Sequence, residues 1–304
     1  MRLGLTIPTF GPLANAENVV AVARNAEGMG YESLWSGDRS LAPVSPQDRY
    51  PGSSDGRMPA AYANHMDPLT ALTFAAAHTT RARLGTSTLN ALWHPPLLLA
   101  RTLSTLDVLS GGRVEAGLGI GWMHEEYEAV NVPWENRGAR LDEFLDVLDK
   151  IWADEVVDHK GRLYTIPASV IEIKPRQRPR PPVLLAAFTP ASMSRVARRA
   201  DGWLPSGMPV PYMMSQWSII TREAEQAGRN PAELRMAARL NVDVTVGESE
   251  QMPVRGTLGQ YIDYAREAAE AGVHELFIDL GFCARSIEER IDLAGRFIEG
   301  VQAG

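Results

Sequence analysis

Short apolar runs alternate with longer segments of helical periodicity from one end of the chain to the other. Between residues 139 and 153, for example, Leu141, Phe144, Leu145 and Leu148 recur at helical spacing and predict an amphipathic helix. The apolar runs predict buried strands at residues 2–8, 33–36, 83–88, 113–118, 183–187, 202–205, 240–246 and 275–280. The predicted helices are 17–28, 67–79, 97–109, 139–153, 191–200, 212–227, 258–271 and 287–301. Eight strand–helix units predict an α/β fold, a (β/α)8 TIM barrel formed by one domain over residues 1–304.

Two segments depart from this alternation. Residues 156–174 alternate polar and apolar positions around a Lys160–Gly161 turn, which predicts a hairpin inserted near residues 154–182. Residues 37–66 show no periodicity and are rich in Pro, Ser and Gly. A structureless loop of about 30 residues in a compact domain is usually functional or disordered. Because it follows the second strand, we expect it to form a lid over the barrel end that carries active sites.

The third strand turns polar as it ends, with Thr86, Ser87 and Thr88 where a parallel sheet usually has Val, Ile or Leu. Polar, small and aromatic residues also follow the other strands. The strand ends supply Thr6, Asp38, Arg39, Asn90, Gly121, Trp122, His124, Glu125, Phe188 and Thr189. In a TIM barrel these ends meet at one mouth, where such a mixture suits a flat, partly polar ring system.

A helix start after the fifth strand permits two interpretations. Thr189 and Pro190 suit the cap and first position of a helix, which would leave the N–H groups of Ala191 and Ser192 pointing outward. The segment could therefore be a well-capped helix and nothing more. Its place after a late barrel strand favours instead a site for a phosphate group.

Composition restricts the classes of function. The formal net charge of −7 argues against binding to a nucleic acid backbone. No run of 18 apolar residues and no signal-peptide pattern occurs, so we expect neither membrane insertion nor export. Cys283 is the single cysteine, which rules out an internal disulfide and fits a cytoplasmic protein. A passive, buried thiol is the preferred interpretation of Cys283, with a nucleophile as the alternative.

Three common catalytic patterns are absent from the sequence. Gly117–Trp122 is glycine-rich but does not match G-x-G-x-x-G, so a dinucleotide site of that type is not expected. His124 and Glu128 have the spacing of two metal ligands on a helix, but a third ligand is missing, and we expect no metal. No G-x-S-x-G motif is present, which leaves an α/β-hydrolase triad without its nucleophile.

The segment RLGTSTLNALWHPPLLLARTLSTLDVLSGGRVEAGLGIGWMHEEYEA resembles the central signature of the bacterial luciferase-like family of flavin- and F420-dependent oxidoreductases. SLWSGDR, LAAFTPASMSRVARRADGWLPSG and AREAAEAGVHELFIDLG follow the same family pattern in the same order. The likeness is greatest to the F420-dependent members. It implies a TIM barrel with an insertion, and a non-prolyl cis peptide bond between Ser87 and Thr88 against the back of the cofactor ring.

The resemblance also assigns roles to residues. It implies cofactor contacts for Asp38, Ser87, Thr88, Phe188, Thr189 and Ala191, and the strand ends and the helix start add Thr6, Asn90, Gly121, Trp122 and Ser192 as expected cofactor contacts. The chain departs from the family pattern at Arg39, where many F420 enzymes have His, and at Trp122, where sugar-phosphate-oxidising relatives have Glu. Sugar-phosphate oxidation is therefore not expected. We expect Asp38, Arg39, His124 and Glu125 to act in catalysis, with His65 as a further possible proton donor, and Arg39, Arg49 or Arg57 to meet an anionic cofactor tail.

Three functions follow from the resemblance. The first is an F420-dependent oxidoreductase that moves a hydride between C5 of the deazaflavin and a small organic substrate. The second is an FMN-dependent monooxygenase that uses O2 and receives reduced flavin from a partner reductase. The third is a non-catalytic flavin-binding protein on the same scaffold. The family also implies a homodimer, for which the apolar helices after the second and third strands could supply the surface.

Overall fold

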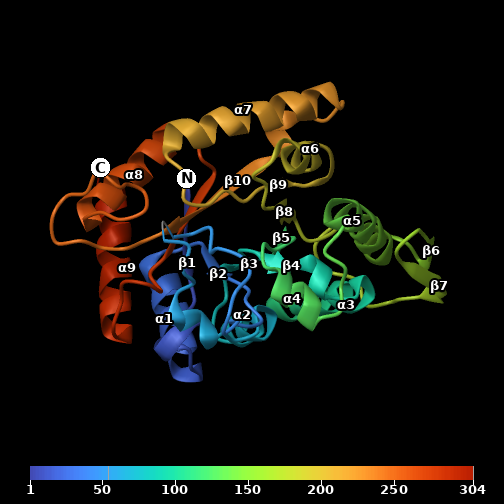
Figure 1. The fold of residues 1–304 in the computed structure, drawn as a ribbon, viewed down its shortest axis with the longest axis horizontal. Coiled ribbons are helices and arrows are strands. Elements are labelled where there is room, and N and C mark those ends of the chain that lie inside the picture. The colour runs from blue at the N-terminus through green and yellow to red at the C-terminus, as the bar shows by residue number, and fades with distance from the viewer. Residues whose placement is uncertain (54, 304) are drawn as a thin grey trace.

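The computed structural model describes residues 1–53 and 55–303. Eight parallel strand positions form a closed barrel, and helices surround it, which confirms the predicted TIM barrel (Figure 1). The barrel strands are β1 (Arg2–Thr6), β2 (Ser33–Ser36), β3 (Arg83–Thr86) with β4 (Leu89–Asn90), β5 (Val114–Gly119), β8 (Val183–Leu185), β9 (Gly202–Trp203), β10 (Arg235–Asn241) and β11 (Glu275–Asp279). Each strand pairs with its neighbour in the order of the chain, and pairing of β1 with β11 closes the ring.

The helices lie close to their predicted positions because their ends carry local stop and start signals. Asn15 and Asp67 cap the first two helices with side-chain oxygens, and Gly30 ends the first helix at a φ of 96°. The long helices are α1 (Ala16–Met29), α2 (Pro68–Ala76), α3 (Pro96–Ser110), α5 (Arg137–Ala153), α6 (Pro190–Arg199), α7 (Val210–Gln226), α8 (Leu258–Glu270) and α9 (Ile287–Gln302). A short helix, α4 (His124–Ala129), follows β5 and was not predicted. Short 3-10 turns lie at Gly11–Leu13, Ala60–Ala63, Ala91–Trp93 and Pro231–Glu233.

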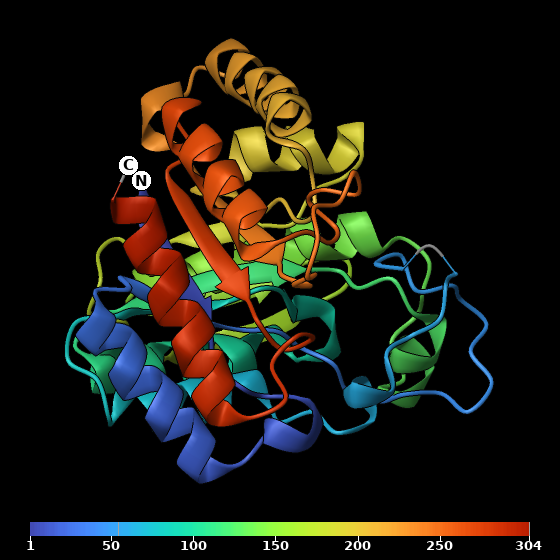
Figure 2. The ribbon, with the colours of Figure 1, turned by 90° about the vertical axis from the view of Figure 1, so that its left-hand side faces the viewer.

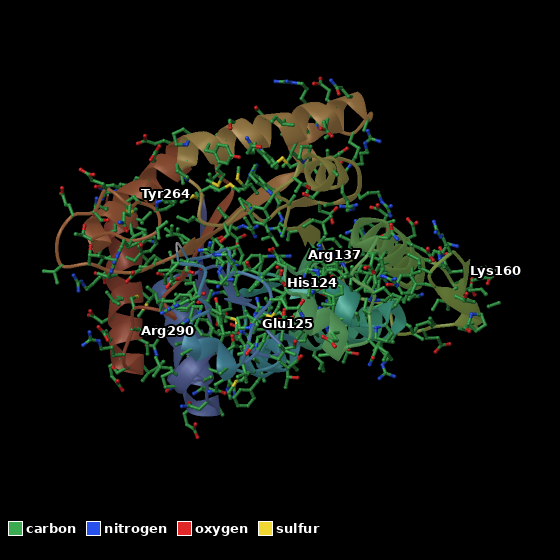
Figure 3. The ribbon with its side chains drawn as sticks, in the orientation of Figure 1. His124, Glu125, Arg137, Lys160, Tyr264 and Arg290 are labelled. Atoms are coloured by element: carbon green, nitrogen blue, oxygen red, sulfur yellow. The ribbon has the colours of Figure 1, made fainter. Side chains whose placement is uncertain are left out.

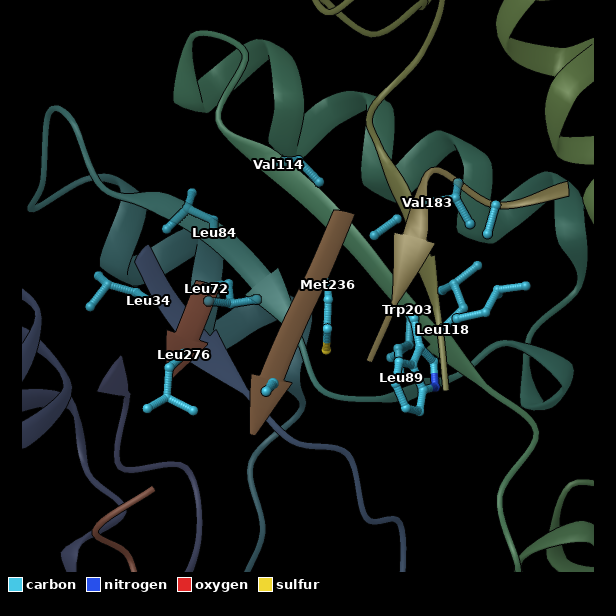
Figure 4. Close-up of a cluster of buried hydrophobic side chains, with 14 of the residues drawn as sticks. Leu34, Leu72, Leu84, Leu89, Val114, Leu118, Val183, Trp203, Met236 and Leu276 are labelled. Atoms are coloured by element: carbon cyan, nitrogen blue, oxygen red, sulfur yellow. The ribbon is translucent and has the colours of Figure 1, made fainter. Parts of the chain in front are cut away.

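The core has two parts. Most buried apolar side chains lie between the barrel and the helices, among them Leu34, Leu72 and Leu84 (Figure 4). A smaller cluster includes Trp35 and Phe277, whose rings stack with centroids 4.3 Å apart. Burial of a large apolar side chain contributes about 1.5–3 kcal/mol, so these two layers hold the strand ends in fixed relative positions.

The third barrel strand is broken where its sequence turns polar. The peptide bond between Ser87 and Thr88 is cis, as the resemblance implies, and separates β3 from β4. Both pieces pair with β5, in the registers Leu84 to Val114 and Leu89 to Leu118. The hydroxyl of Thr86 donates to the carbonyl of Gly117 at 2.7 Å and accepts from its N–H at 3.1 Å. The polar side chain thus replaces strand pairing at the break.

Gly119 leaves room for this break. A Cβ at position 119 would lie 2.9 Å from Oγ1 of Thr88, which is closer than real Cβ atoms approach. The glycines of β5 therefore allow the neighbouring strand to bring Thr88 toward them.

The seventh barrel strand is the clear error among the predicted elements. The sequence predicts residues 240–246, whereas β10 covers Arg235–Asn241. Arg235 and Arg239 interrupt its apolar pattern, and both guanidinium groups are used in ion pairs with buried carboxylates. The apolar positions that suggested the later strand extend into a loop.

The two irregular segments are also found. β6 (Val156–Lys160) and β7 (Thr165–Val170) form the predicted antiparallel hairpin, which projects from the barrel in Figure 1. Residues 37–53 and 55–66 form a long loop, interrupted by the 3-10 turn Ala60–Ala63, at one side of the molecule (Figure 2).

Candidate active site

Asp38 lies immediately after β2, and its carboxyl group is largely removed from solvent. The N–H of Asn90, at the end of β4, donates to Oδ2 of Asp38 at 3.0 Å. Burial raises the pKa of Asp38 to about 7, and the nearby carboxylates of Glu126 and Asp67 add to the shift. Asp38 is therefore an acid that can gain or lose a proton near neutral pH.

Arg39 points to a different set of groups. Its guanidinium donates to Oε2 of Glu126 at 2.6 Å and lies 4.9 Å from the centre of the Trp122 ring. The ring of Tyr62 is 5.8 Å away on another side. Since Glu126 balances its charge, Arg39 joins the loop to the segment after β5 in this structure. A role for Arg39 toward an anionic cofactor tail stays a prediction.

The first turn of α4 holds the long loop at three points, and we name His124, Glu125 and Glu126 the α4 clasp (Figure 3). The N–H and Nδ1 of His124 contact the carboxylate of Asp48 at 2.8 and 2.9 Å. The N–H of Gln47 donates to Glu125 at 2.6 Å, and that of Ser40 donates to Glu126 at 3.0 Å. These contacts show a loop-holding role for His124 and Glu125, whose catalytic role stays a prediction.

Aromatic side chains from four parts of the chain pack together beside the clasp. The ring of Tyr62 lies 5.2 Å from that of Phe10 and 5.6 Å from that of Phe282, at centroid distances. Tyr50 continues the cluster to Trp122, with centroids 5.6 Å apart. Because Phe10 follows β1 and Phe282 follows β11, the loop lays its tyrosines over the barrel mouth.

His65 completes the aromatic cluster by stacking on Phe10, with ring centroids 5.8 Å apart. Burial lowers the pKa of His65, and the neighbouring Arg39 and Arg239 lower it further. His65 is therefore a weak base whose neutral form is favoured at neutral pH.

A buried ion cluster lies within the mouth, and the sequence did not reveal it. Arg239 of β10 pairs with Asp279 of β11 and donates to the carbonyl oxygen of Ser87 at 2.7 Å. The hydroxyl of Thr6 donates to Asp279 at 3.0 Å, and Arg290 of α9 donates to the Thr6 carbonyl at 2.7 Å (Figure 3). A charged residue within an otherwise apolar strand was the signal that could have identified Arg239.

Gly121 lies against Asn90, which is beside Asp38. Gly121 has a φ of 65°, and a side chain there would collide with Nδ2 of Asn90. Among the described residues, Nδ2 of Asn90 and Nε1 of Trp93 are buried without a hydrogen-bond partner. Unsatisfied buried donors suit the carbonyl oxygens of a flavin-type ring.

The helix start after β8 uses its donors internally. Thr189 and Ser192 form a reciprocal capping box, in which the N–H groups of Phe188 and Thr189 donate to Oγ of Ser192 at 3.1 and 2.9 Å. The N–H of Ser192 donates to Thr189, so the well-capped helix is the observed state. Among the described residues, no hydrogen bond or ring contact joins this cap to Asp38. Phosphate binding by Phe188, Thr189, Ala191 and Ser192 stays a prediction.

The remaining chemical groups do not form a second centre. Within residues 1–53 and 55–303, no group of three or more His, Cys, Asp or Glu side chains is placed to hold a metal ion. No helix in these ranges has the length and apolar character needed to cross a membrane. Burial raises the pKa of Cys283 to about 11, so its thiol is unsuited to act as a nucleophile at neutral pH.

A family model described as luciferase-like monooxygenase matches residues 1–277. The chain belongs to this family. An uncharacterized protein of Mycobacterium tuberculosis is 33% identical over 211 residues, which cover 67% of this chain and 74% of that protein. Members of the luciferase-like family include monooxygenases and F420-dependent oxidoreductases, and the chain is an enzyme of this class.

Two solved structures show how far the fold is shared. The monooxygenase RslO1 from Streptomyces bottropensis matches with a TM-score of 0.81 at 22% identity, over 100% of this chain and 99% of that protein. An F420-dependent secondary alcohol dehydrogenase, solved with an F420–acetone adduct, matches with a TM-score of 0.80 at 15% identity, over 99% and 98%. At these identities the likeness shows the fold alone.

Proposed function

We propose that the protein is an F420-dependent oxidoreductase that interconverts a carbonyl compound and the corresponding alcohol. The observation that carries the proposal is Asp38, a buried carboxyl at the barrel mouth with a pKa raised to about 7. Reduction of a carbonyl group requires an acid of this strength beside the oxygen that gains a proton. Among the described residues, no group donates a hydrogen bond to Oδ1 of Asp38, which leaves this oxygen available to a substrate.

The reaction balances with one hydride and one proton. A reduced cofactor, held beside Asn90 and the break at Ser87 and Thr88, would supply the hydride for the new C–H bond, and the carbonyl π electrons would move to oxygen. Asp38 gives its proton to that oxygen and becomes a carboxylate, which a proton from solvent restores. In the opposite direction, the Asp38 carboxylate accepts the hydroxyl proton as the hydride leaves the alcohol carbon.

The residues present at the mouth fit a flavin-type ring. Asn90 and Trp93 each offer an unpartnered buried donor, while Ser87 and Thr88 lie at the break between β3 and β4. The preference for F420 over FMN is supported by the likeness of the chain as a whole to F420-dependent members. The solved secondary alcohol dehydrogenase, which carries F420 bound to a ketone, supports the choice of substrate class.

The loop of residues 37–66 must move for the site to fill. Tyr62 packs on Phe10 and Phe282 over the mouth, and burial raises its pKa well above the usual range. The α4 clasp holds the edge of the loop by hydrogen bonds and ion pairs. We infer that these contacts break when the loop opens and form again when it closes over cofactor and substrate.

Direct binding of the two cofactors tests the proposal. The purified protein is titrated with F420 and with FMN, each in oxidised and reduced form, and binding is followed by calorimetry. Ketones and secondary alcohols are then assayed with F420 by its absorbance. Tight binding of F420 with turnover of a ketone or alcohol supports the proposal. Tight binding of FMN alone, with O2-dependent turnover, would identify the monooxygenase, and binding without turnover across the panel would identify a non-catalytic carrier.

We infer further that the chain forms a homodimer through α2 and α3. Phe74, Leu98, Val108 and Leu109 are large apolar residues of these helices with 42–66% of their surface exposed. Contiguous exposed apolar side chains of this kind mark association surfaces. Sedimentation equilibrium should give a dimer for the wild type and a monomer for the double variant Leu98→Lys, Leu109→Lys. A monomeric wild type at micromolar concentration would reject the inference.

A further inference from the structure

The guanidinium of Arg239 ties three barrel strands together at the mouth. It donates from Nε to Asn241 of its own strand at 2.9 Å, pairs with Asp279 on β11, and donates to the Ser87 carbonyl at 2.7 Å. Gly37, after β2, lies next to this contact: a Cβ at position 37 would be 3.6 Å from Arg239 Nη1 and 3.6 Å from the Ser87 carbonyl oxygen. Arg239 therefore fixes the position of a backbone oxygen at the break in the third strand.

The cluster around Arg239 carries more positive than negative charge. Arg239 and Arg290 contribute two guanidinium groups, and Asp279 contributes one carboxylate. The side chains of Arg239 and Asp279 are 16% and 1% exposed, so water screens this excess poorly. Because Asp279 alone faces two guanidinium groups, the cluster has one positive charge in excess, which favours an anionic ligand.

The other groups near Arg239 do not neutralise it. Tyr50 and Tyr62 face it from the loop, with their hydroxyl oxygens 3.2 Å apart, and burial keeps the Tyr62 hydroxyl protonated. The nearby Arg39 is paired with Glu126, and burial keeps His65 neutral. The pKa of Asp38 near 7 leaves it only partly charged at neutral pH.

We propose that Arg239 is a positioning residue that holds the Ser87 carbonyl and gives the mouth a fixed positive charge, so that the bound cofactor ring is held in its anionic form. The inference rests on the proposed binding of a flavin or deazaflavin at this mouth. A flavin-type ring is a weak acid, and a nearby cation stabilises its conjugate base. The bound ring should therefore have a lower pKa than the free cofactor.

The experiment is a spectroscopic pH titration of the bound cofactor, which needs no turnover. Oxidised F420, or FMN if that is the cofactor bound, is titrated in saturating wild-type protein and in the variants Arg239→Gln and Arg239→Lys. Arg83→Gln is the matched control, because Arg83 also pairs with a buried carboxylate, Glu115, but at the other end of the barrel. Thermal unfolding of each variant checks the fold.

Removal of the charge in Arg239→Gln should raise the pKa of the bound cofactor ring by about one unit, which is a tenfold decrease in its acid dissociation constant. Arg239→Lys should keep the ring pKa near the wild-type value but bind the cofactor about three- to tenfold more weakly, since lysine cannot reach Ser87 and Asp279 together. Arg83→Gln should change neither quantity.

Equal ring pKa values in wild type and Arg239→Gln would overturn the inference while leaving the proposed function intact. An equal shift in Arg83→Gln would also overturn it, because the effect would then be global. If Arg239→Gln does not fold, Arg239→Lys decides: wild-type affinity in that variant would reject the positioning role. Failure of the wild type to bind either cofactor would reject the proposed function itself, and this inference with it.

Discussion

The barrel has a cluster of buried charge at each end, and the two clusters differ in how their carboxyl groups are held. At the amino-terminal end, Glu115 and Glu275 are within ion-pair distance of Arg2, Arg83 and Arg235. Burial alone would raise the pKa of Glu115, but Arg235 and Arg83 hold it below its usual value. At the mouth, Asp279 pairs with Arg239 in the same way, but Asp38 has no such partner, since Arg39 pairs with Glu126 instead.

This difference separates a structural role from a chemical one. Glu115, whose pKa Arg235 and Arg83 hold low, stays charged across the physiological range and contributes to the fold, whereas burial and the adjacent Glu115 raise the pKa of Glu275. A buried carboxyl without an ion pair keeps a pKa near neutrality and can exchange protons with a substrate. The same residue type thus serves stability at one end of the barrel and, under our proposal, catalysis at the other.

The largest effect should come from Asp38→Asn. The amide keeps the shape and the hydrogen bond with Asn90 but cannot give a proton, so ketone reduction should slow by about 10²- to 10⁴-fold. Steady-state rates with F420 measure the loss. Cofactor affinity and unfolding temperature should stay near wild type. A variant that retains more than a third of the wild-type kcat would show that Asp38 is not the acid.

Glu115→Ala should lower the stability of the fold and leave cofactor binding unchanged, the opposite of Asp38→Asn. It removes a buried carboxylate that pairs with Arg83 and is one of two partners of Arg235, so the free energy of unfolding should fall by about 3–5 kcal/mol. Urea unfolding measures the change. Cofactor affinity at a temperature where the variant is folded should not change. A loss of affinity with little loss of stability would break the division between the two ends.

The pH dependence of catalysis should sharpen the same contrast. Carbonyl reduction needs protonated Asp38, so kcat/KM should be level below pH 7 and fall about tenfold per pH unit above it, because the pKa is about 7. The reverse oxidation needs the carboxylate and should rise over the same range. In Asp38→Asn both profiles should lose this step. An unchanged step in the variant would assign the titration to another group.

Asp48→Asn should have the smallest effect. The variant weakens the contact between Asp48 of the loop and His124. The Asp48 side chain is 24% exposed and that of His124 is 41% exposed. Partly exposed pairs contribute about 0–1 kcal/mol, so cofactor affinity should fall by about fivefold at most. Asp292→Asn is the control, because it removes an exposed pair with Arg296 on α9. A similar loss in the control would show that the α4 clasp is not specific to the site.

The sequence predicted much of this architecture, because burial leaves a periodic pattern. The buried strands and helices of the barrel wall appear as apolar runs and stripes in the sequence. The polar ending of the third strand marked an irregularity there, and the family resemblance implied the cis bond between Ser87 and Thr88. The hairpin was visible from alternation and its turn. These features depend on neighbours in the chain, which the sequence displays directly.

The charges inside the barrel could not be predicted in the same way. Glu115, Arg235 and Arg239 look like misplaced polar residues until strands far apart in the chain bring their partners together. For the same reason the sequence could not show that Arg39 pairs with Glu126, or that His124 and Glu125 bind the loop. The capping box at Thr189 was foreseen as one of two interpretations, but not its use of the Phe188 N–H.

The α4 clasp fixes the number of residues between the end of β5 and the first turn of α4. Successive residues of an α-helix project about 100° apart. One extra residue between Trp122 and His124 would therefore turn the three clasp residues away from their partners in the loop. Between Ser40 and Gln47 the chain is under no such restriction, and Val44 there lies fully in solvent. Related proteins can therefore lengthen or shorten the segment between Ser40 and Gln47 while the contacts of Ser40, Gln47 and Asp48 with α4 are kept.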